Sequence, residues 1–333
     1  MFEKWLTKWK EWNQPPPDLV WLQVELTTHC NACCTYCPRT VAGSSWHNRH
    51  MEMNVFQRLL PSLPFIPYIH LQGWGEPLLH PDFFPMVNLV VQSGSQCGTT
   101  SNGVLIDGPM ARRLVDSGLQ VIGLSLTGTG KCHDRFRPGA SVAQLKKALH
   151  FLAKARKEAK KATPSIHIAY LLMAEGIDEL DGLPDLLDGS PVSQVVISTL
   201  DYIPSPELSR QVIAENTPLA LLAKEKIIAL RQRLSSQGIQ VAGHLIDTPH
   251  HTALSTCSEQ VHQTLLLGVD GHVFPCVFAK MPPPAGKNEL CFGNLQHSNL
   301  QQIWNSEPYR KFRASFRNGT LNDVCRACHK RTS

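Results

Sequence analysis

The chain has 333 residues, of which 42% are hydrophobic and 18% charged, with a formal net charge of +5 at pH 7. This composition suits a folded protein with a sizeable core and excludes a disordered chain. No apolar run is long enough to span a bilayer, and the single basic run, at 154–161, is typical of a solvated helix end. We therefore expect neither a membrane nor a nucleic acid as partner.

The cysteine content indicates the cellular compartment. Eleven cysteines occur without a recognisable export signal, which predicts a reducing cytoplasm rather than a disulfide framework. In such a compartment, clustered cysteines are typical of metal ligands. The clusters lie in two places, one near each end of the chain.

The first cluster follows a predicted buried strand. Residues 1–18 form a short N-terminal extension that ends in a run of prolines, and the apolar run Leu19–Leu26 then predicts a strand. Cys30, Cys34 and Cys37 come directly after it, with a C-x3-C-x2-C spacing. The thiolates would therefore stand at the carboxyl end of a strand, where parallel sheets place their chemistry.

Three thiolates at this spacing can hold three irons of a four-iron cluster and leave the fourth iron open for a substrate. A zinc site is the alternative, since paired cysteines also bind zinc. Cys33 lies inside the loop but out of register, so we interpret it as a non-ligand.

The loop resembles that of the radical S-adenosylmethionine (radical SAM) superfamily, in which an aromatic residue, here Tyr36, precedes the third cysteine. The resemblance implies a [4Fe–4S] cluster whose open iron is chelated by SAM. One electron, supplied by a flavodoxin- or ferredoxin-type reductant, then cleaves SAM to a 5′-deoxyadenosyl radical that abstracts a hydrogen atom from the substrate.

Further motifs follow the next strands of the chain. A strand near 67–72 ends in Gly73-Trp74-Gly75-Glu76-Pro77, which resembles the family's G-G-E-P motif with Trp74 in place of one glycine. The resemblance assigns Gly73, Gly75 and Glu76 to SAM binding, because glycine allows the backbone to approach a ligand closely. An ordinary turn after a strand is the alternative interpretation.

The resemblance extends to three polar residues after the third and fourth strands. It places Asn102 in the cavity that binds SAM, although an ordinary turn after a strand is the alternative there. It assigns Ser125 and Arg137 to the polar groups of SAM, with Arg135 as the competing arginine. An arginine suits a carboxylate because two N–H groups of its guanidinium can donate to both carboxylate oxygens.

Three other residues are weaker candidates. The resemblance makes Tyr170 and Met173 candidates for contact with the adenine of SAM, although both residue types are more often plain core residues. Cys132 is a weak candidate for a hydrogen-atom donor, because a free cysteine is usually a small buried hydrophobe.

Strands and helices alternate up to about residue 245, which indicates βαβ units and a parallel sheet. We count six such units, as in the partial (β/α)6 TIM-like barrel of the resembled family, and place this barrel at 19–248. The sequence predicts helices over 53–63, 83–92, 110–117, 141–160, 177–187 and 218–236. It predicts the later strands at 121–126, 166–173, 194–199 and 239–244.

The C-terminal part, 249–333, contains the second cysteine cluster. A hairpin with an Asp270-Gly271 turn is followed by a loop at 281–286 and a helix from Leu300 to Phe316. Four cysteines could form a thiolate cage here: Cys257, Cys276, Cys325 and Cys328.

Zinc would fit such a cage in isolation. Beside a radical SAM domain, the layout resembles the twitch form of the SPASM domain, which binds an auxiliary [4Fe–4S] cluster. Cys291 could replace Cys257 as a ligand. Complete ligation by thiolates would leave no open iron, so this cluster would relay electrons.

The expected function is therefore a radical SAM oxidoreductase-type reaction, either oxidation or epimerisation, on a small molecule or cofactor precursor. We expect the small molecule because few residues precede the first strand. A peptide or protein (metalloenzyme) maturase is the first alternative, and a non-catalytic iron–sulfur or zinc protein is the second.

Overall fold

The computed structural model describes residues 18–200, 202–203, 205–214, 217–243, 245, 256–280, 290–326, 328 and 330–332. Residues 1–17 of the N-terminal extension expected at 1–18, the end of the seventh strand at His244 and the loop at 281–286 lie outside these ranges. The described residues divide into two compact units. The first unit comprises residues 18–29, 46–97 and 256–332, and the second comprises 30–45 and 98–245.

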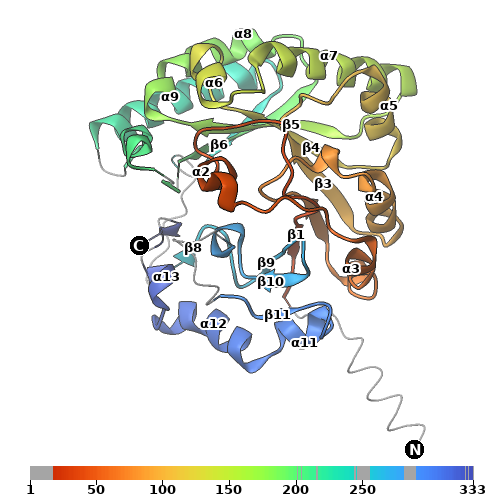
Figure 1. Cartoon of the computed structure of the whole chain (residues 1–333). Coiled ribbons are helices and arrows are strands. Elements are labelled where there is room, and N and C mark those ends of the chain that lie inside the picture. Colours follow the sequence, from red (N-terminus) through yellow and green to blue (C-terminus); the bar gives the residue numbers. More distant parts are fainter. Residues whose placement is uncertain are drawn as a thin grey trace, which may run out of the picture. The chain divides into compact units, whose positions relative to one another are not determined.

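The first unit is built on strands in the order β11-β10-β9-β1-β2. Their bounds are β1 Trp21–Val24, β2 Tyr68–Leu71, β9 Thr264–Leu267, β10 His272–Phe274 and β11 Gly293–Asn294. Strand β1 pairs in parallel with β2 on one side and with β9 on the other. The first strand of the chain therefore lies beside a strand that comes more than two hundred residues later (Figure 1).

The expected hairpin at Asp270-Gly271 is present. Strands β9 and β10 pair antiparallel, and Gly271 has a φ of 86°, a left-handed conformation that favours glycine. Helices of this unit are α3 Met53–Gln57, α4 Phe83–Gln92, α11 Leu300–Trp304, α12 Glu307–Asn318 and α13 Asp323–Arg326. Strands β8 Thr256–Cys257 and β12 Arg331–Thr332 form a separate antiparallel pair.

Two predicted helices of this unit are shorter than expected, and proline accounts for both differences. The helix expected over 53–63 ends at Gln57, and Pro61 and Pro64 follow. The helix expected from Leu300 to Phe316 is two helices, because Ser306 caps a new one with Pro308 in its first turn. Helix α4 has the expected bounds.

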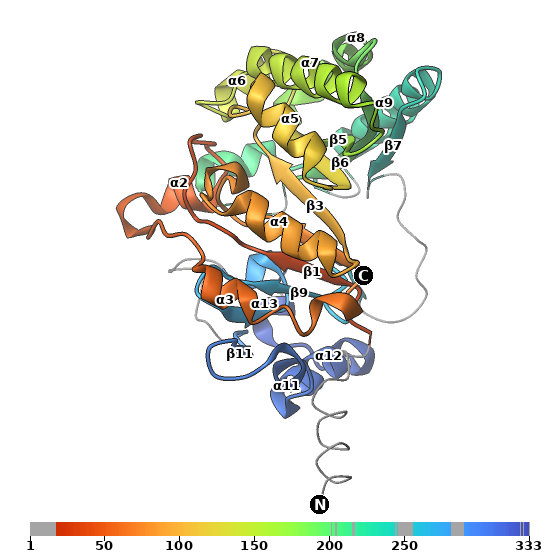
Figure 2. The same cartoon turned by 90° about the vertical axis from the view of Figure 1, so that its right-hand side faces the viewer.

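The second unit is a parallel sheet in the order β3-β4-β5-β6-β7. The strands are β3 Gln96–Ser101, β4 Val121–Leu126, β5 Ser165–Leu172, β6 Val192–Thr199 and β7 Gln240–Gly243. The helices are α2 Pro38–Ala42, α5 Gly108–Asp116, α6 Lys131–Phe136, α7 Val142–Ala159, α8 Leu183–Leu187 and α9 Pro218–Ser235. Figures 1 and 2 show α5, α7, α8 and α9 covering one side of these strands. This is the alternating βα arrangement that the sequence predicted.

Local sequence explains where the helices of this unit begin and end. Ser141 and Gln144 form the predicted capping box at the start of α7. The helix expected over 177–187 is instead a 3-10 turn, Asp178–Gly182, followed by α8, because Pro184 lacks the N–H that a continuous helix needs. Helix α6 lies in a stretch for which the sequence predicted no helix.

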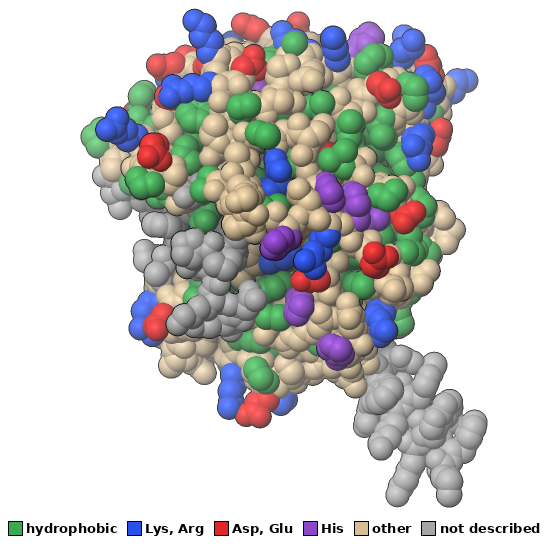
Figure 3. Space-filling view, in the orientation of Figure 1, with side chains coloured by type: hydrophobic (Ala, Val, Ile, Leu, Met, Phe, Trp, Pro, Cys, Tyr) green, Lys and Arg blue, Asp and Glu red, His purple; other side chains and the backbone are tan. Residues whose placement is uncertain are grey.

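No helix in the described ranges is both long enough and apolar enough to cross a membrane. On the face shown in Figure 3, acidic and basic side chains are interspersed over the outer helices of the second unit.

A buried ion pair holds the first unit together at the end of β1. The side chain of Glu25 has no exposure to solvent, and its carboxylate pairs with the Lys280 ammonium after the hairpin. The same carboxylate accepts hydrogen bonds from the backbone N–H groups of Trp74, at 3.1 Å, and Val269, at 3.4 Å. One carboxylate therefore joins three segments that are far apart in the sequence.

We predict that Lys280→Met lowers the apparent free energy of unfolding by about 3 kcal/mol or more, because it leaves a buried carboxylate without its cation. Urea denaturation of the reconstituted protein measures this. Lys311→Met is the matched control, since Lys311 pairs with Glu307 on the exposed surface of α12. Equal effects of the two variants would contradict the structural role of the Glu25 pair.

Candidate functional site

The three cysteines of the first cluster lie on one loop between β1 and α2. Cys30, Cys34 and Cys37 are half-buried, whereas Cys33 is exposed. The backbone N–H of Cys37 donates to the Cys34 carbonyl at 3.0 Å, and Cys37 immediately precedes α2. Pro38 opens this helix and fixes the chain direction after the third thiol. The loop therefore presents a set of three thiols, as the spacing predicted.

Contacts within the second unit position this loop. Asn102 follows β3, and its side-chain amide donates to Asn31 Oδ1 at 2.8 Å and lies 4.0 Å from Cys30 Sγ. The Cys33 N–H donates to the Pro138 carbonyl at 2.8 Å, and Gly139 has a φ of 90°. A side chain at Gly139 would begin 3.0 Å from the Asn31 carbonyl oxygen, so only glycine allows this approach.

Tyr36 forms a buried polar network with two residues that follow β4. Its hydroxyl lies 3.2 Å from Thr127 Oγ1 and accepts a hydrogen bond from the Arg137 guanidinium. Burial raises the pKa of Tyr36 to about 12, although Arg137 acts in the opposite direction. Burial alone would lower the pKa of the Arg137 guanidinium. The electrostatic effects of Tyr36 and Cys34 are larger in sum, so the pKa is raised. Arg137 is therefore a permanent cation beside the cysteine loop.

Arg137 also has unused hydrogen-bonding capacity. It is only 7% exposed, and its Nε has no hydrogen-bond partner within the described ranges. A buried N–H donor without an acceptor is costly, so this group fits an anionic ligand such as the carboxylate of SAM. Arg135, the competing candidate, is exposed and pairs with Glu175 at 2.8 Å.

His133 is a positioning residue that the sequence reasoning missed. Its Nδ1 accepts from the Thr127 N–H at 3.1 Å, and its Nε2 lies 2.8 Å from the Ala140 carbonyl. Burial, assisted by the charge of Arg137, lowers the pKa of His133 to about 4, so the ring is neutral near pH 7. The neutral ring fixes Thr127, which in turn contacts Tyr36. The only sequence signal was its place in the run before Arg137.

The Gly73-to-Glu76 motif packs tightly on the end of β1. A Cβ at Gly75 would lie 2.3 Å from the Thr27 carbonyl oxygen, and one at Gly73 would lie 2.1 Å from the Glu25 side chain. Glu76 is buried, and its carboxylate caps the following turn by accepting from the Leu78 N–H at 3.2 Å. A side chain at Gly75 would therefore collide with backbone atoms, and one at Gly73 with the side chain of Glu25, so both positions require glycine independently of any ligand.

Trp74 occupies the position where the sequence departs from the family motif. Its ring packs edge-to-face on Phe278, with the ring centres 6.2 Å apart. Its indole Nε1 is buried and has no acceptor among the residues that the structure describes.

Four other sequence candidates lie in the second unit, with Ser125 and Tyr170 on strands, Met173 just after β5 and Cys132 on α6. Ser125 is half-buried on β4, opposite Ala169 of β5. Tyr170 and Met173 are almost fully buried. Cys132 is 4% exposed, packs with Met173 and Phe136, and has a pKa of about 12, raised by burial. Tyr36 packs against this same apolar cluster.

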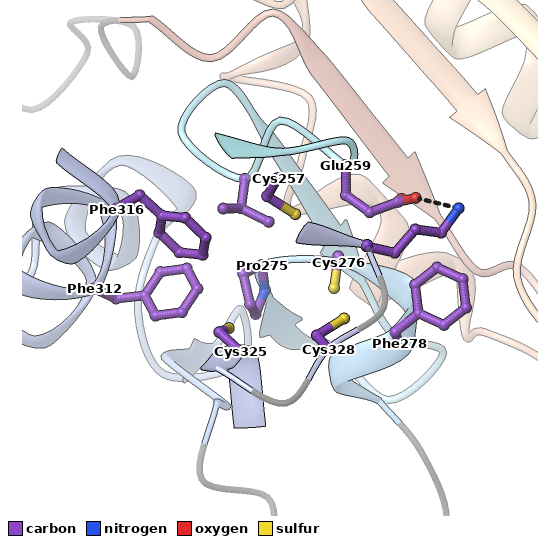
Figure 4. Close-up of a pocket in the computed structure, with 11 residues that line it drawn as sticks. Cys257, Glu259, Pro275, Cys276, Phe278, Phe312, Phe316, Cys325 and Cys328 are labelled. Atoms are coloured by element: carbon purple, nitrogen blue, oxygen red, sulfur yellow. Dashed lines mark ion pairs between the residues drawn. The ribbon is translucent and has the colours of Figure 1, made fainter. Parts of the chain in front are cut away.

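The second set of cysteines lies around one pocket of the first unit. The thiols of Cys257, Cys276, Cys325 and Cys328 line it, together with apolar walls from Pro275, Phe312 and Phe316. Figure 4 shows the four cysteine side chains facing this shared space. Cys291 does not line the pocket, and its sulfur lies 3.6 Å from the Gly293 carbonyl oxygen.

Backbone pairing brings these four cysteines together. Cys257 lies on β8, which pairs antiparallel with β12 at Arg331, just after Cys328. Cys276 follows β10, and the N–H of Cys325 donates to Asn322 Oδ1 at 2.8 Å. Closing the β8–β12 pair therefore brings the first cysteine of the set beside the last.

The thiols of this pocket line a shared space and do not converge on one point in the described structure. In the ranges that the structure describes, no three His, Cys, Asp or Glu side chains converge on a single metal position. A four-iron cluster takes one thiolate at each iron, whereas zinc gathers all its ligands around one point. The arrangement therefore suits an iron–sulfur cluster better than zinc.

Burial raises the pKa of three of the thiols that line this pocket. It raises the pKa of Cys257 to about 11 and that of Cys325 to about 12, and it also raises the pKa of Cys276. A metal ligand must be the thiolate, so a cluster that binds here displaces these protons.

Two family descriptions match the chain. The radical SAM superfamily matches residues 24–182, and SPASM, described as an iron–sulfur cluster-binding domain, matches residues 257–329. The tungsten-containing aldehyde ferredoxin oxidoreductase cofactor-modifying protein of Pyrococcus furiosus is 24% identical, over 93% of this chain and 87% of its own length. An AdoMet-dependent heme synthase of Methanosarcina barkeri is 25% identical, over 87% of this chain and 83% of its own length. The PqqA peptide cyclase of Granulibacter bethesdensis is 21% identical, over 96% of this chain and 81% of its own length.

Solved structures share the fold. Native anSMEcpe with bound AdoMet has a TM-score of 0.67 and 16% identity, covering 93% of this chain and 86% of its own. SuiB from Streptococcus suis bound to S-adenosylmethionine has a TM-score of 0.68 and 17% identity, covering 98% and 74%. These similarities confirm the mixed α/β partial TIM-like barrel that the sequence predicted.

The two matched regions contain the two cysteine sets described above. A radical SAM domain requires SAM and a [4Fe–4S] cluster, and a SPASM domain requires auxiliary iron–sulfur binding. The chain therefore belongs to the radical SAM superfamily, has a SPASM domain at its C-terminal end, and uses S-adenosylmethionine and iron–sulfur clusters as its cofactors.

Proposed function

We propose that this protein is a radical SAM oxidoreductase-type enzyme that acts on a small molecule or a cofactor precursor. The observation that carries the proposal is the difference between its two cysteine sets. Cys30, Cys34 and Cys37 supply three thiols on an open loop, whereas four thiols enclose the pocket in the first unit. Three thiolates leave one iron of a four-iron cluster free for SAM, and four leave none.

The bound cluster and SAM would supply a radical that abstracts a hydrogen atom from the substrate. The residues of this chain would then hold the reactants. Arg137 would bind the carboxylate of SAM, because it is buried, cationic and has a free donor in the described structure. Tyr36 and Thr127 fix its guanidinium, and Asn102 fixes the cysteine loop. Gly73, Gly75, Glu76 and Ser125 remain predicted contacts of SAM, and Cys132 remains a weak candidate for a hydrogen donor.

The enclosed pocket would hold the auxiliary [4Fe–4S] cluster through Cys257, Cys276, Cys325 and Cys328. Its walls are mostly apolar, which suits a group that accepts or returns an electron without binding substrate. The half-buried Cys291 lies outside this set, so Cys257 is the proposed fourth ligand. A cytoplasmic flavodoxin- or ferredoxin-type reductant remains the proposed electron donor.

The relatives support a small or cofactor-like substrate. Two of those named above are, by their names, a cofactor-modifying protein and a heme synthase. A peptide substrate is the second candidate, because the PqqA peptide cyclase also matches nearly the whole chain.

Fractions of cell extract separate the two substrate classes. The reconstituted enzyme is given the low-molecular-mass fraction or the macromolecular fraction, and 5′-deoxyadenosine is measured above the level without addition. Stimulation by the small molecules alone supports the first candidate. Stimulation by the macromolecular fraction alone would replace it with the second.

We predict that anaerobic reconstitution with iron and sulfide gives about eight irons per chain, as two four-iron clusters require. Dithionite and SAM should then yield 5′-deoxyadenosine. Tight zinc binding without cleavage of SAM would contradict the enzymatic function altogether.

The two cysteine sets should respond differently to mutation. Cys34→Ala is expected to abolish the formation of 5′-deoxyadenosine, because it removes a ligand of the cluster that binds SAM. Cys325→Ala is expected to leave this cleavage largely intact and to stop only the complete reaction. Sustained turnover in Cys34→Ala would overturn the assignment of the first loop.

The role of Arg137 can be tested by the binding of SAM. Arg137→Lys should weaken binding by about tenfold to a hundredfold, since a hydrogen bond to a charged group contributes roughly 1.5–3 kcal/mol. Equilibrium dialysis of SAM against the reconstituted protein measures this. Arg135→Lys is the matched control, and an equal loss in both variants would remove Arg137 from the site.

A further inference from the structure

Two charged side chains stand beside the four thiols of the enclosed pocket. Among the described residues that line this pocket, only Glu259 and Lys330 carry a formal charge. Their side chains form an ion pair at 3.4 Å and are 28% and 16% exposed, respectively. Figure 4 shows the pair, joined by a dashed line, next to Cys257 and Cys276. Neither residue is needed as a ligand, because four thiols are already present.

The chain holds this pair in a fixed position. Glu259 lies two residues after Cys257, and Lys330 lies two residues after Cys328. The N–H of Ser258 donates to the Lys330 carbonyl at 2.9 Å, which joins the two segments through their backbones. The Lys330 ammonium also lies 5.3 Å from the centre of the Phe278 ring. Both charges therefore have defined places relative to the cysteines.

The apolar walls of the pocket strengthen the electrostatic effect of these two charges on a cluster bound there. The remaining lining residues, apart from the cysteines, are apolar: Val261, Pro275, Phe278, Phe312 and Phe316. Charges interact more strongly across apolar protein than across water. Reduction adds one electron to a cluster, so a nearby ammonium favours the reduced state and a nearby carboxylate opposes it.

We propose that Glu259 and Lys330 act on the reduction potential of the auxiliary cluster in opposite directions, Glu259 lowering it and Lys330 raising it. The inference rests on the proposed ligation of that cluster by Cys257, Cys276, Cys325 and Cys328. With both charges present, their effects largely cancel. Removal of either one leaves the other to act on the cluster alone. The pair are positioning residues for electron transfer and not ligands.

The test uses the full chain with Cys30→Ala, Cys34→Ala and Cys37→Ala, so that the auxiliary cluster alone gives a signal. Its potential is measured by redox titration followed by electron paramagnetic resonance. Glu259→Gln should raise the potential, because it leaves Lys330 unpaired. Lys330→Met should lower it, because it leaves Glu259 unpaired. The variant that combines Glu259→Gln with Lys330→Met should have a potential close to that of the starting protein.

A matched control pair lies in the same unit. Glu307 and Lys311 form an ion pair at 2.7 Å on the exposed surface of α12, away from the pocket lining. Glu307→Gln and Lys311→Met change the net charge of the protein by the same amounts but should leave the potential unchanged.

Three results would overturn the inference. Potentials that stay the same in both single variants, with the cluster present, would overturn it and leave the proposed function intact. Shifts of both single variants in one direction would indicate loosened packing and would also overturn it. A starting protein that holds no iron would overturn the four-cysteine ligation and the inference together.

Discussion

The carboxylate of Glu25 is the point on which the first unit depends. It has no contact with water, and it receives the Lys280 ammonium and the backbone N–H groups of Trp74 and Val269. A buried charge is tolerated only where partners surround it, so the strand, the Gly73-to-Glu76 motif and the hairpin must come together for the unit to fold. The buried position of Glu25 also requires glycine at residue 73, because any side chain there would collide with Glu25. The motif that the family uses for SAM is thus joined to the domain that holds the auxiliary cluster.

The two cysteine sets differ in their surroundings as well as in number. The three thiols of the first loop are half-buried and lie in the second unit with the polar residues Asn102, Tyr36 and Arg137. The four thiols of the other set are also half-buried, but they line a pocket whose walls are apolar apart from Glu259 and Lys330. A polar, cationic environment suits a group that must receive an ionic ligand, whereas an apolar wall suits a group that only exchanges electrons. Under the proposed function, sulfur would therefore serve as ligand in two different surroundings of this chain.

Trp74 shows how a departure from a family motif can have a structural reason. Its backbone N–H is committed to Glu25, and its ring lies against Phe278, which lines the auxiliary pocket two residues after Cys276. A glycine at this position would keep the first contact and lose the second. The residue thus links the Gly73-to-Glu76 motif to the neighbourhood of Cys276 within one unit.

The sequence by itself determined the α/β alternation, the hairpin at Asp270-Gly271, the capped start of α7 and both sets of cysteines. These features follow from local periodicity, turn chemistry and spacing, which act over a few residues. It did not determine where proline would divide the helices after Met53 and Leu300. Nor did it reveal His133, Glu25 and Lys280, or the pairing of Glu259 with Lys330. It could not choose between Cys257 and Cys291 for the pocket, because that choice depends on β8 pairing with β12 across more than seventy residues. Only the tertiary structure decides such contacts, since burial and charge pairing act between residues whose separation in the sequence carries no pattern.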